Sequence, residues 1–206
     1  TVTGKASHIS RIEDGVDARL FIEPMLKLNQ YLLEIGFPKC EGNVMVSNEF
    51  WRRDVSSFKA LINTWTQNMS DASVQEFSIF LDAKCVAGDE SLLEELRTYL
   101  YARFENRDDV LAHIAKAVLN FQTPLSLFSG FVLEKDHNNK LDLKKGGIFA
   151  LVHGVRTLAL EYGIRETNTI ERIKVLNNRG VIDKNFATEL IESFDSLLAI
   201  RLQAML

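Results

Sequence analysis

Residues 141–163 read LDLKKGGIFALVHGVRTLALEYG, and this stretch decides the fold class. After the glycine pair, apolar residues recur every three or four positions, which is the spacing of one face of an α-helix. These residues are Ile148, Leu151, Val152, Val155, Ala159 and Tyr162. Gly163 then supplies a helix stop. The stretch therefore predicts a helix that follows Gly147 and ends at Gly163.

The same periodicity runs through most of the chain, which contains only three prolines. Gly36 and Pro38 end a first helix that is expected to start near Pro24. Asp54 is expected to cap the next helix, and residues 73–85 fit a helix although their period is ambiguous. Two further helices are expected to be capped by Asp108 or Asp109 and by Thr167 or Thr169. The other predicted starts are Gly88–Asp89 and about Asp183. The last helix is expected to bury Phe186, Leu190, Phe194, Leu197 and Leu198.

One segment has the pattern of a β-hairpin. The strand-like sequences FVLEK (131–135) and KLDLK (140–144) flank the turn sequence DHNN. The predicted fold is therefore mainly α, an antiparallel helical bundle of about six or seven helices with one small inserted β-hairpin. Residues 1–16 lack the helical period and are interpreted as a tail, or as the remnant of an upstream domain. Residues 17–206 form the predicted helical domain.

The amino-acid composition of the chain excludes several classes of function. Apolar residues make up 46% of the chain, charged residues 25%, and the formal net charge is −4. This is ordinary for a globular protein and lacks the basic stripe of a nucleic-acid binder, so no nucleic-acid partner is expected. The two cysteines are isolated, no apolar run reaches a membrane span, and no signal peptide is readable. We expect a cytoplasmic protein without a zinc site.

The glycine pair raises the question of an anion site. The first N–H groups of a helix have no partner within it, and glycines let a phosphate approach the backbone. Lys144, Gly146–Gly147 and Arg156 could therefore form one anion-binding corner, with Arg156 about 14 Å further along the helix axis. Asp142 and Asp82 would neutralise this corner when it is empty. The alternative is that the glycines only start the helix.

Two further groups could hold a ligand or serve the structure alone. Asp82 lies in an apolar segment with Lys84, and its expected partner is Arg156 or Lys144. A purely structural ion pair is the alternative. The loop at residues 37–54 carries amide and guanidinium groups beside a tryptophan, namely Asn48, Trp51, Arg52 and Arg53. These side chains suit a base and phosphates, but Trp51 could equally fill the core.

Four patterns, in this order, resemble a known family. They are GFPKCEGNVMVSNEFWR, SIFLDAKCVAGDESLLEEL, LDLKKGGIFALVHGVRTLALEYGI and TIERIKVLNNRGVI. They are similar to the C-terminal substrate-binding domain of bacterial predicted nucleotidyltransferases, which often follows cyclic-nucleotide-binding and CBS domains. The layout also resembles, more distantly, the helical domain of glutamine-synthetase adenylyltransferase and of the related uridylyltransferase. The resemblance covers roughly residues 20–206.

The resemblance implies a helical domain that positions a nucleotide and an acceptor in signal transduction and is not catalytic alone. Implied partners are a nucleoside triphosphate, a protein acceptor, and upstream catalytic or regulatory domains. The family's Gly–Ser turn and Asp-x-Asp metal pair are not readable, so no cofactor is expected in this chain and Mg²⁺ is expected for the full enzyme. The implied ligand-binding residues are Asn48, Trp51, Arg52, Asp82, Lys84, Asp142, Lys144, Gly147 and Arg156.

Two other function classes remain open. The helical module could serve protein interaction or dimerisation without binding a nucleotide, and a homodimer is one such assembly. An exposed apolar patch on the last helix would favour that reading. The second alternative is a small-molecule sensor, which a closed pocket away from the glycine pair would favour.

Overall fold

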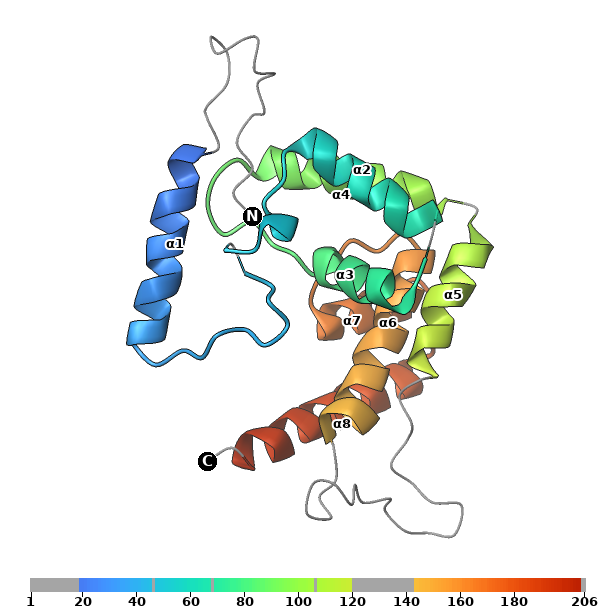
Figure 1. The fold of residues 1–206 in the computed structure, drawn as a ribbon. Coiled ribbons are helices and arrows are strands. Elements are labelled where there is room, and N and C mark those ends of the chain that lie inside the picture. Colours follow the sequence, from blue (N-terminus) through green and yellow to red (C-terminus); the bar gives the residue numbers. More distant parts are fainter. Residues whose placement is uncertain (1–18, 46, 68, 106, 120–142, 205–206) are drawn as a thin grey trace. The chain divides into compact units, whose positions relative to one another are not determined.

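The computed structural model describes residues 19–45, 47–67, 69–105, 107–119 and 143–204, which are mainly helical (Figure 1). The described residues form eight α-helices, a short 3₁₀ turn and a π-helical segment, and the mainly-α prediction is confirmed. The elements are α1 (Arg19–Glu34), η2 (Glu49–Trp51), α2 (Val55–Gln67), α3 (Asp71–Leu81), α4 (Glu90–Phe104), α5 (Asp108–Val118), η4 (Lys144–Phe149), α6 (Ala150–Glu161), α7 (Thr169–Asn178) and α8 (Lys184–Gln203).

The predicted β-hairpin falls almost entirely in residues 120–142, outside the described part of the chain. No strand occurs among the described residues. The last two residues of the predicted second strand, Leu143 and Lys144, are helical, so the strand prediction is wrong there. A short run of alternating apolar residues is ambiguous between strand and helix, and here the helix extends further toward the N-terminus than the glycines suggested.

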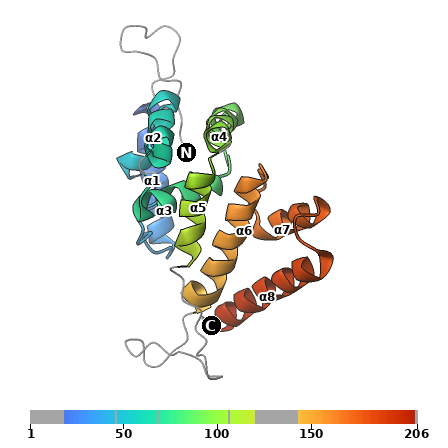
Figure 2. The same cartoon turned by 90° about the vertical axis from the view of Figure 1, so that its right-hand side faces the viewer.

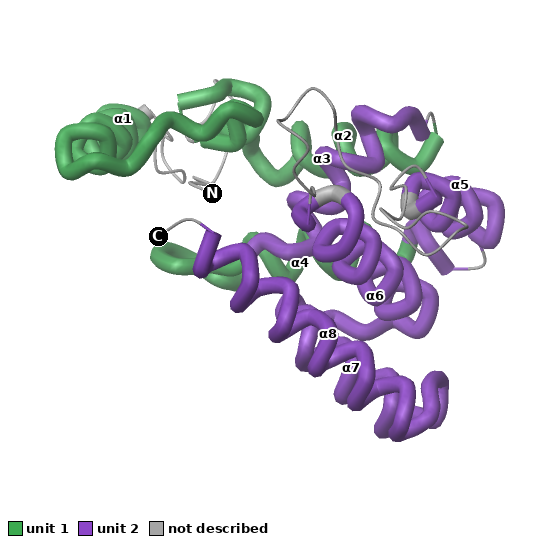
Figure 3. Tube along the Cα trace, turned by 90° about the horizontal axis from the view of Figure 1, so that it is seen from below, with its two compact units in different colours: residues 1–67, 84–102 green, residues 68–83, 103–206 purple. Residues whose placement is uncertain are grey.

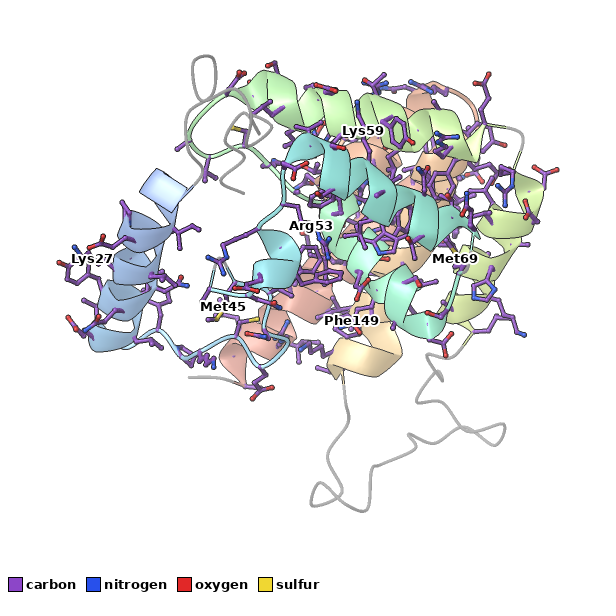
Figure 4. All side chains as sticks on the ribbon, turned by 45° about the horizontal axis from the view of Figure 1, so that its top comes forward. Lys27, Met45, Arg53, Lys59, Met69 and Phe149 are labelled. Carbon is purple, nitrogen blue, oxygen red and sulfur yellow. The ribbon has the colours of Figure 1, made fainter. Side chains whose placement is uncertain are left out.

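The chain divides into two compact units (Figure 3). The first comprises residues 1–67 and 84–102, and within it α2 and α4 are joined by side chains. Lys59 forms an ion pair with Glu95 and lies over the ring of Tyr99 at 5.3 Å (Figure 4). The Tyr99 hydroxyl donates to the Asn63 side-chain oxygen at 3.0 Å. The second unit comprises residues 68–83 and 103–206.

The second unit is organised around α6. This helix packs against α5 and α7, and α8 packs on α7 and on η4 (Figure 2). The apolar stripe of α6 packs against the inner faces of α7 and α8. Together they form one core of buried residues: Val155, Ala159, Ile164, Ile173, Leu176 and Ala187. Because Ile173 and Leu176 are fully buried, α7 is fixed by this core.

One predicted helix cap is confirmed and two are wrong. Asp54 accepts the Ser57 N–H at 2.8 Å. Asp183, the predicted start of the last helix, is the N-cap of α8. The cap of α7 is Asn168, between the two predicted threonines, and its side-chain oxygen accepts two backbone N–H groups. Asparagine is a stronger cap than threonine, which accounts for the difference. At α5 the N-cap is Arg107, whose side chain makes no capping bond, and the two aspartates occupy the first turn.

Helix α8 is less buried than its sequence predicted. Ala187 is its one buried residue among those described; Leu190, Phe194 and Leu197 are half-buried. Phe186 and Leu198 are 46% and 39% exposed, so their predicted burial is wrong. At 1.5 Å per residue, α8 is about 30 Å long and α7 about 15 Å, so α7 cannot cover the whole of α8.

Helix α1 also presents apolar side chains to solvent. Leu28 and Leu32 are exposed, and Ile35, directly after the helix, is 71% exposed. Pro24 lies inside the helix rather than at its start. None of the described helices is both long and apolar enough to cross a membrane.

We predict that Leu176→Ala lowers the free energy of unfolding by about 2–5 kcal/mol, because the substitution leaves a cavity where no solvent reaches. The matched control is Leu119→Ala, since Leu119 is 80% exposed and the same truncation should change stability by about 0.5 kcal/mol at most. Urea denaturation followed by circular dichroism measures both. Equal losses in the two variants would contradict this description of the core.

Candidate functional site

One side of the helix formed by η4 and α6 carries a row of four polar and aromatic side chains. We call Lys144, Phe149, His153 and Arg156 the α6 row. The Lys144 ammonium lies 5.2 Å from the centre of the Phe149 ring, and that ring meets His153 edge-on at 6.2 Å. The Arg156 Nη1 lies 3.3 Å from His153 Nδ1. Each member therefore contacts the next, and Figure 4 labels Phe149 at the start of the helix.

The π-helical turn places Lys144 in this row. In a regular α-helix, residues five apart point about 140° away from one another. A π turn closes bonds between residues five apart, so Lys144 and Phe149 lie on the same side. Such turns occur frequently at functional sites. The row therefore depends on this local departure from α-helical geometry.

Gly147 lies inside the π turn and contacts α8. A Cβ atom on Gly147 would meet the two terminal methyl carbons of Leu197 at 3.0 and 3.1 Å. The helix already includes Leu143, so the glycine pair lies within its first described turns and does not precede it. The predicted ligand role of Gly147 stays a prediction. A bulky substitution here would disturb packing on α8 as well as ligand access.

Asp82 is shared by two arginines of the second unit. It ends α3, and its carboxylate pairs with Arg156 through both oxygens and with Arg172 Nη1 at 2.7 Å. The Arg156 and Arg172 side chains are 8% and 2% exposed, whereas Asp82 is 33% exposed. A carboxylate at a helix C-terminus is unfavourable because of the helix dipole, and the two guanidinium groups offset this. The predicted pairing of Asp82 with Arg156 is present.

Arg172 is also held from a second direction. Its Nε donates to the Glu166 backbone oxygen at 2.6 Å, while its Nη1 has no hydrogen bond to any described residue despite its closeness to Asp82. The distance qualifies as an ion pair, but the N–H direction misses the carboxylate oxygen. One buried donor of Arg172 is therefore left without a well-directed acceptor.

His153 is a neutral member of the row. The pKa of His153 is lowered from its ordinary value of 6.5 to about 4. Burial is the largest cause and the positive charge of Arg156 the next, while Asp82 acts in the opposite direction. The neutral imidazole can accept a hydrogen bond from Arg156 through Nδ1, which a protonated ring could not do. The positive charge of the row therefore comes from Lys144 and Arg156 alone.

The first unit contains a separate hollow of about 610 Å³. It is lined by Ile22, Glu49, Phe50, Arg52, Arg53, Asp54 and Ser57. Arg52 pairs with Glu49 at 3.4 Å, and its Nε is buried with no hydrogen-bond partner in the described part of the chain. Arg53 donates from Nε to the Phe50 carbonyl at 2.8 Å and lies over the Phe50 ring (Figure 4). Two guanidinium groups thus border this hollow.

The other predicted ligand residues of the first unit have structural partners. Asn48 caps η2 by accepting the Phe50 N–H and donates to the Asn43 carbonyl, both at 3.0 Å. Trp51 is half-buried with its ring edge-on to Phe50, and it does not line the hollow. Lys84 is exposed. Their roles in binding stay predictions.

The remaining predicted residue, Asp142, lies outside the described part of the chain. Sequence reasoning missed Phe149 and Arg172. The four-residue spacing from Phe149 to His153 is a helical signal that could have found the first. Nothing in the sequence marks Arg172 as buried.

Magnesium has no evident site in the described residues. Among them, no group of three or more histidine, cysteine, aspartate or glutamate side chains is arranged to hold a metal ion. Two-metal transfer chemistry needs carboxylates close to each other. We therefore assign no magnesium ligand among these residues.

Two family models match the chain. Residues 108–206 match the family described as "Putative nucleotidyltransferase substrate binding domain", and residues 9–72 match the family described as "Putative nucleotidyltransferase DUF294". The α6 row and Arg172 lie in the first match; Asn48, Trp51 and Arg52 lie in the second. Asp82 and Lys84 lie between the two. No curated protein and no solved structure matches the chain.

We predict a loss of stability in mild acid that depends on His153. Between pH 6.5 and about 4, the imidazole of His153 is protonated in the unfolded chain but stays neutral in the folded protein. The free energy of unfolding therefore falls as the pH falls through this range. His153→Asn keeps an acceptor near the position of Nδ1 but does not titrate. Urea denaturation at pH 7 and pH 5 should show a smaller loss for the variant than for the wild type. The same loss in both would contradict the lowered pKa.

Proposed function

Since the chain belongs, over residues 9–72 and 108–206, to the nucleotidyltransferase family that these two models describe, we propose that its helical part holds a nucleoside triphosphate and presents it to an acceptor. The family membership confirms the predicted resemblance. The match over residues 108–206 carries the proposal, because the description of that family names substrate binding. The α6 row lies within the matched residues and supplies the chemistry.

Each member of the α6 row has a role in the proposed complex. Lys144 is exposed and carries a flexible ammonium group that suits a phosphate oxygen. It now lies over the Phe149 ring, and a nucleotide base could take that place by stacking. Arg156 is held by Asp82 and His153 at the other end of the row, where it offers a fixed guanidinium group to further phosphates.

The first unit carries proposed ligand residues of its own. Arg52 is the strongest candidate there, because it borders the hollow and its Nε lacks a partner. Asn48, Trp51 and Lys84 are retained as proposed ligands, and so is Asp142 beside the row in sequence. Asn48 and Trp51 could exchange their present contacts for contacts with a nucleotide when it binds.

We do not propose that this chain transfers the nucleotide by itself. The family's aspartate pair is not readable in the sequence, and Mg²⁺ is assigned to the full enzyme. Upstream catalytic or regulatory domains, a protein acceptor, a role in signal transduction and a cytoplasmic location all follow from the resemblance alone. They belong to the proposal as expectations.

The test is a calorimetric titration of the 206-residue chain with ATP, CTP, GTP and UTP at low salt. We expect weak binding that decreases with added salt, because the Lys144 end of the row is exposed. Lys144→Ala should lower the affinity by up to about 1.5–3 kcal/mol, the usual contribution of a charged hydrogen bond. Phe149→Leu should also lower it by removing the stacking surface.

Lys174→Ala is the matched control, since Lys174 is an exposed lysine of the same unit that pairs with Glu171. It should bind as the wild type does. The proposal fails if the wild type binds none of the four nucleotides, or if Lys144→Ala and Lys174→Ala bind equally well. Gly147→Val is a poorer probe because it also disturbs the contact with Leu197.

A second candidate function is self-association through α8. Its exposed apolar side chains are Phe186, Leu198, Ile200 and Leu202, with Leu202 61% exposed. Leu198 and Leu202 are four residues apart and therefore share a side of the helix. Apolar patches of this kind mark interaction surfaces, and a second copy of the chain is the simplest partner.

Leu202→Asp tests this candidate. If α8 pairs two chains, the substitution should shift the concentration at which dimers form to higher values, because a carboxylate would be buried at the interface. Ser196→Asp adds the same charge at another exposed position of α8 and serves as the control. Sedimentation velocity over a range of concentrations measures both. A wild type that is monomeric at every concentration rules out this candidate.

A further inference from the structure

We infer that Arg156 and Arg172 form a seat for a phosphate group, and that the Asp82 carboxylate occupies this seat until a polyphosphate displaces it. The inference rests on the proposed nucleotide site, because Arg156 belongs to both. It adds Arg172 as a ligand, and it assigns the polyphosphate end of the nucleotide to the Arg156 end of the α6 row.

The net charge of the cluster of Arg156, Arg172 and Asp82 favours an anion with more negative charge than one carboxylate. Two guanidinium groups that stay protonated at any ordinary pH share one carboxylate, so the three side chains carry a net positive charge. His153 is neutral and does not change this balance. Both arginine side chains are more than nine-tenths buried, where an uncompensated positive charge is costly. A phosphate group with up to two negative charges would compensate both.

The directions of the hydrogen bonds favour phosphate over carboxylate. Both arginines approach Asp82 Oδ1: Arg156 Nε at 3.4 Å and Arg172 Nη1 at 2.7 Å. The Nη1 group of Arg172 gains no hydrogen bond from this contact. A terminal phosphate has three oxygens in a tetrahedral arrangement and can offer separate acceptors to the two guanidinium groups. The buried donor that Asp82 leaves unsatisfied would then be satisfied.

Each arginine has a second partner besides Asp82, whereas Asp82 is placed to leave. Arg172 is anchored by the Glu166 carbonyl at 2.6 Å, and Arg156 contacts His153 Nδ1 at 3.3 Å. Asp82 is the most exposed member of the three and ends α3, and residues 83–86 have no regular structure. A change in the backbone after α3 can therefore move the carboxylate without moving the seat.

The experiment uses inorganic tripolyphosphate, which has no base, at constant ionic strength. Asp82→Asn removes the competing charge, and calorimetry should show at least about tenfold tighter binding than for the wild type, a difference of about 1.4 kcal/mol. Asp109→Asn is the matched control, because Asp109 also pairs with an arginine of the same unit, Arg107, but at an exposed site. It should bind as the wild type does. Equal affinities of Asp82→Asn and the wild type would overturn the inference.

A second variant decides the question if Asp82→Asn does not fold. Arg172→Gln leaves the pair of Asp82 with Arg156 intact and should lower tripolyphosphate affinity about tenfold. Arg179→Gln changes an exposed arginine near the end of α7 that binds the Tyr162 carbonyl, and it should keep wild-type affinity. The inference is wrong if these two variants bind tripolyphosphate equally.

The outcomes separate this inference from the proposed function. If nucleotides bind and respond to Lys144→Ala, but Arg172→Gln has no effect on tripolyphosphate, the nucleotide site stands and the seat fails. If tripolyphosphate responds to Asp82 and Arg172 as expected, but Lys144→Ala and Lys174→Ala bind nucleotides equally, the seat stands and the nucleotide site fails.

Discussion

The carboxylate of Asp82 is the contact on which the second unit depends most. It joins the end of α3 to α6 through Arg156 and to α7 through Arg172. Removing one partner of a buried ion pair leaves a charge without compensation, which typically costs about 3–5 kcal/mol. Hydrophobic contacts can be repacked in several ways, whereas these ion pairs join particular residues of the three helices. They thereby fix which faces of the three helices meet.

The helical architecture was largely readable from the sequence, because it depends on local features. Apolar spacing, scarce prolines and glycine stops identified the helices. Asp54 was recognised as a cap, and Asp183 as the approximate start of the last helix, from their positions alone. The burial of individual side chains was harder to predict, since it depends on which other element packs against that face of the helix. The apolar stripe of α8 is a property of its own sequence, but the shorter α7 determines how much of that stripe is covered.

The candidate site was only partly readable for the same reason. Asp82 with Arg156 could be named as one of two pairings, because an aspartate in an apolar segment needs a cation. Arg172 could not be found, since an arginine in a polar helix usually faces solvent and here the packing of α7 buries it. Lys144 and Phe149 are five residues apart, a spacing that a regular helix places on different sides. The π turn that brings them together leaves no recognisable signature in the sequence.

That turn has a consequence for comparing this chain with its relatives. A π turn holds one residue more than an α turn, so it is equivalent to a single-residue insertion that the helix has absorbed. A relative without the insertion would have a regular helix here, and its sequence would align with this one only across a one-residue gap between the lysine and the phenylalanine. An ungapped alignment would pair the lysine with a residue on another side of the helix. The length of this segment, as well as its residue types, therefore identifies which relatives can form the α6 row.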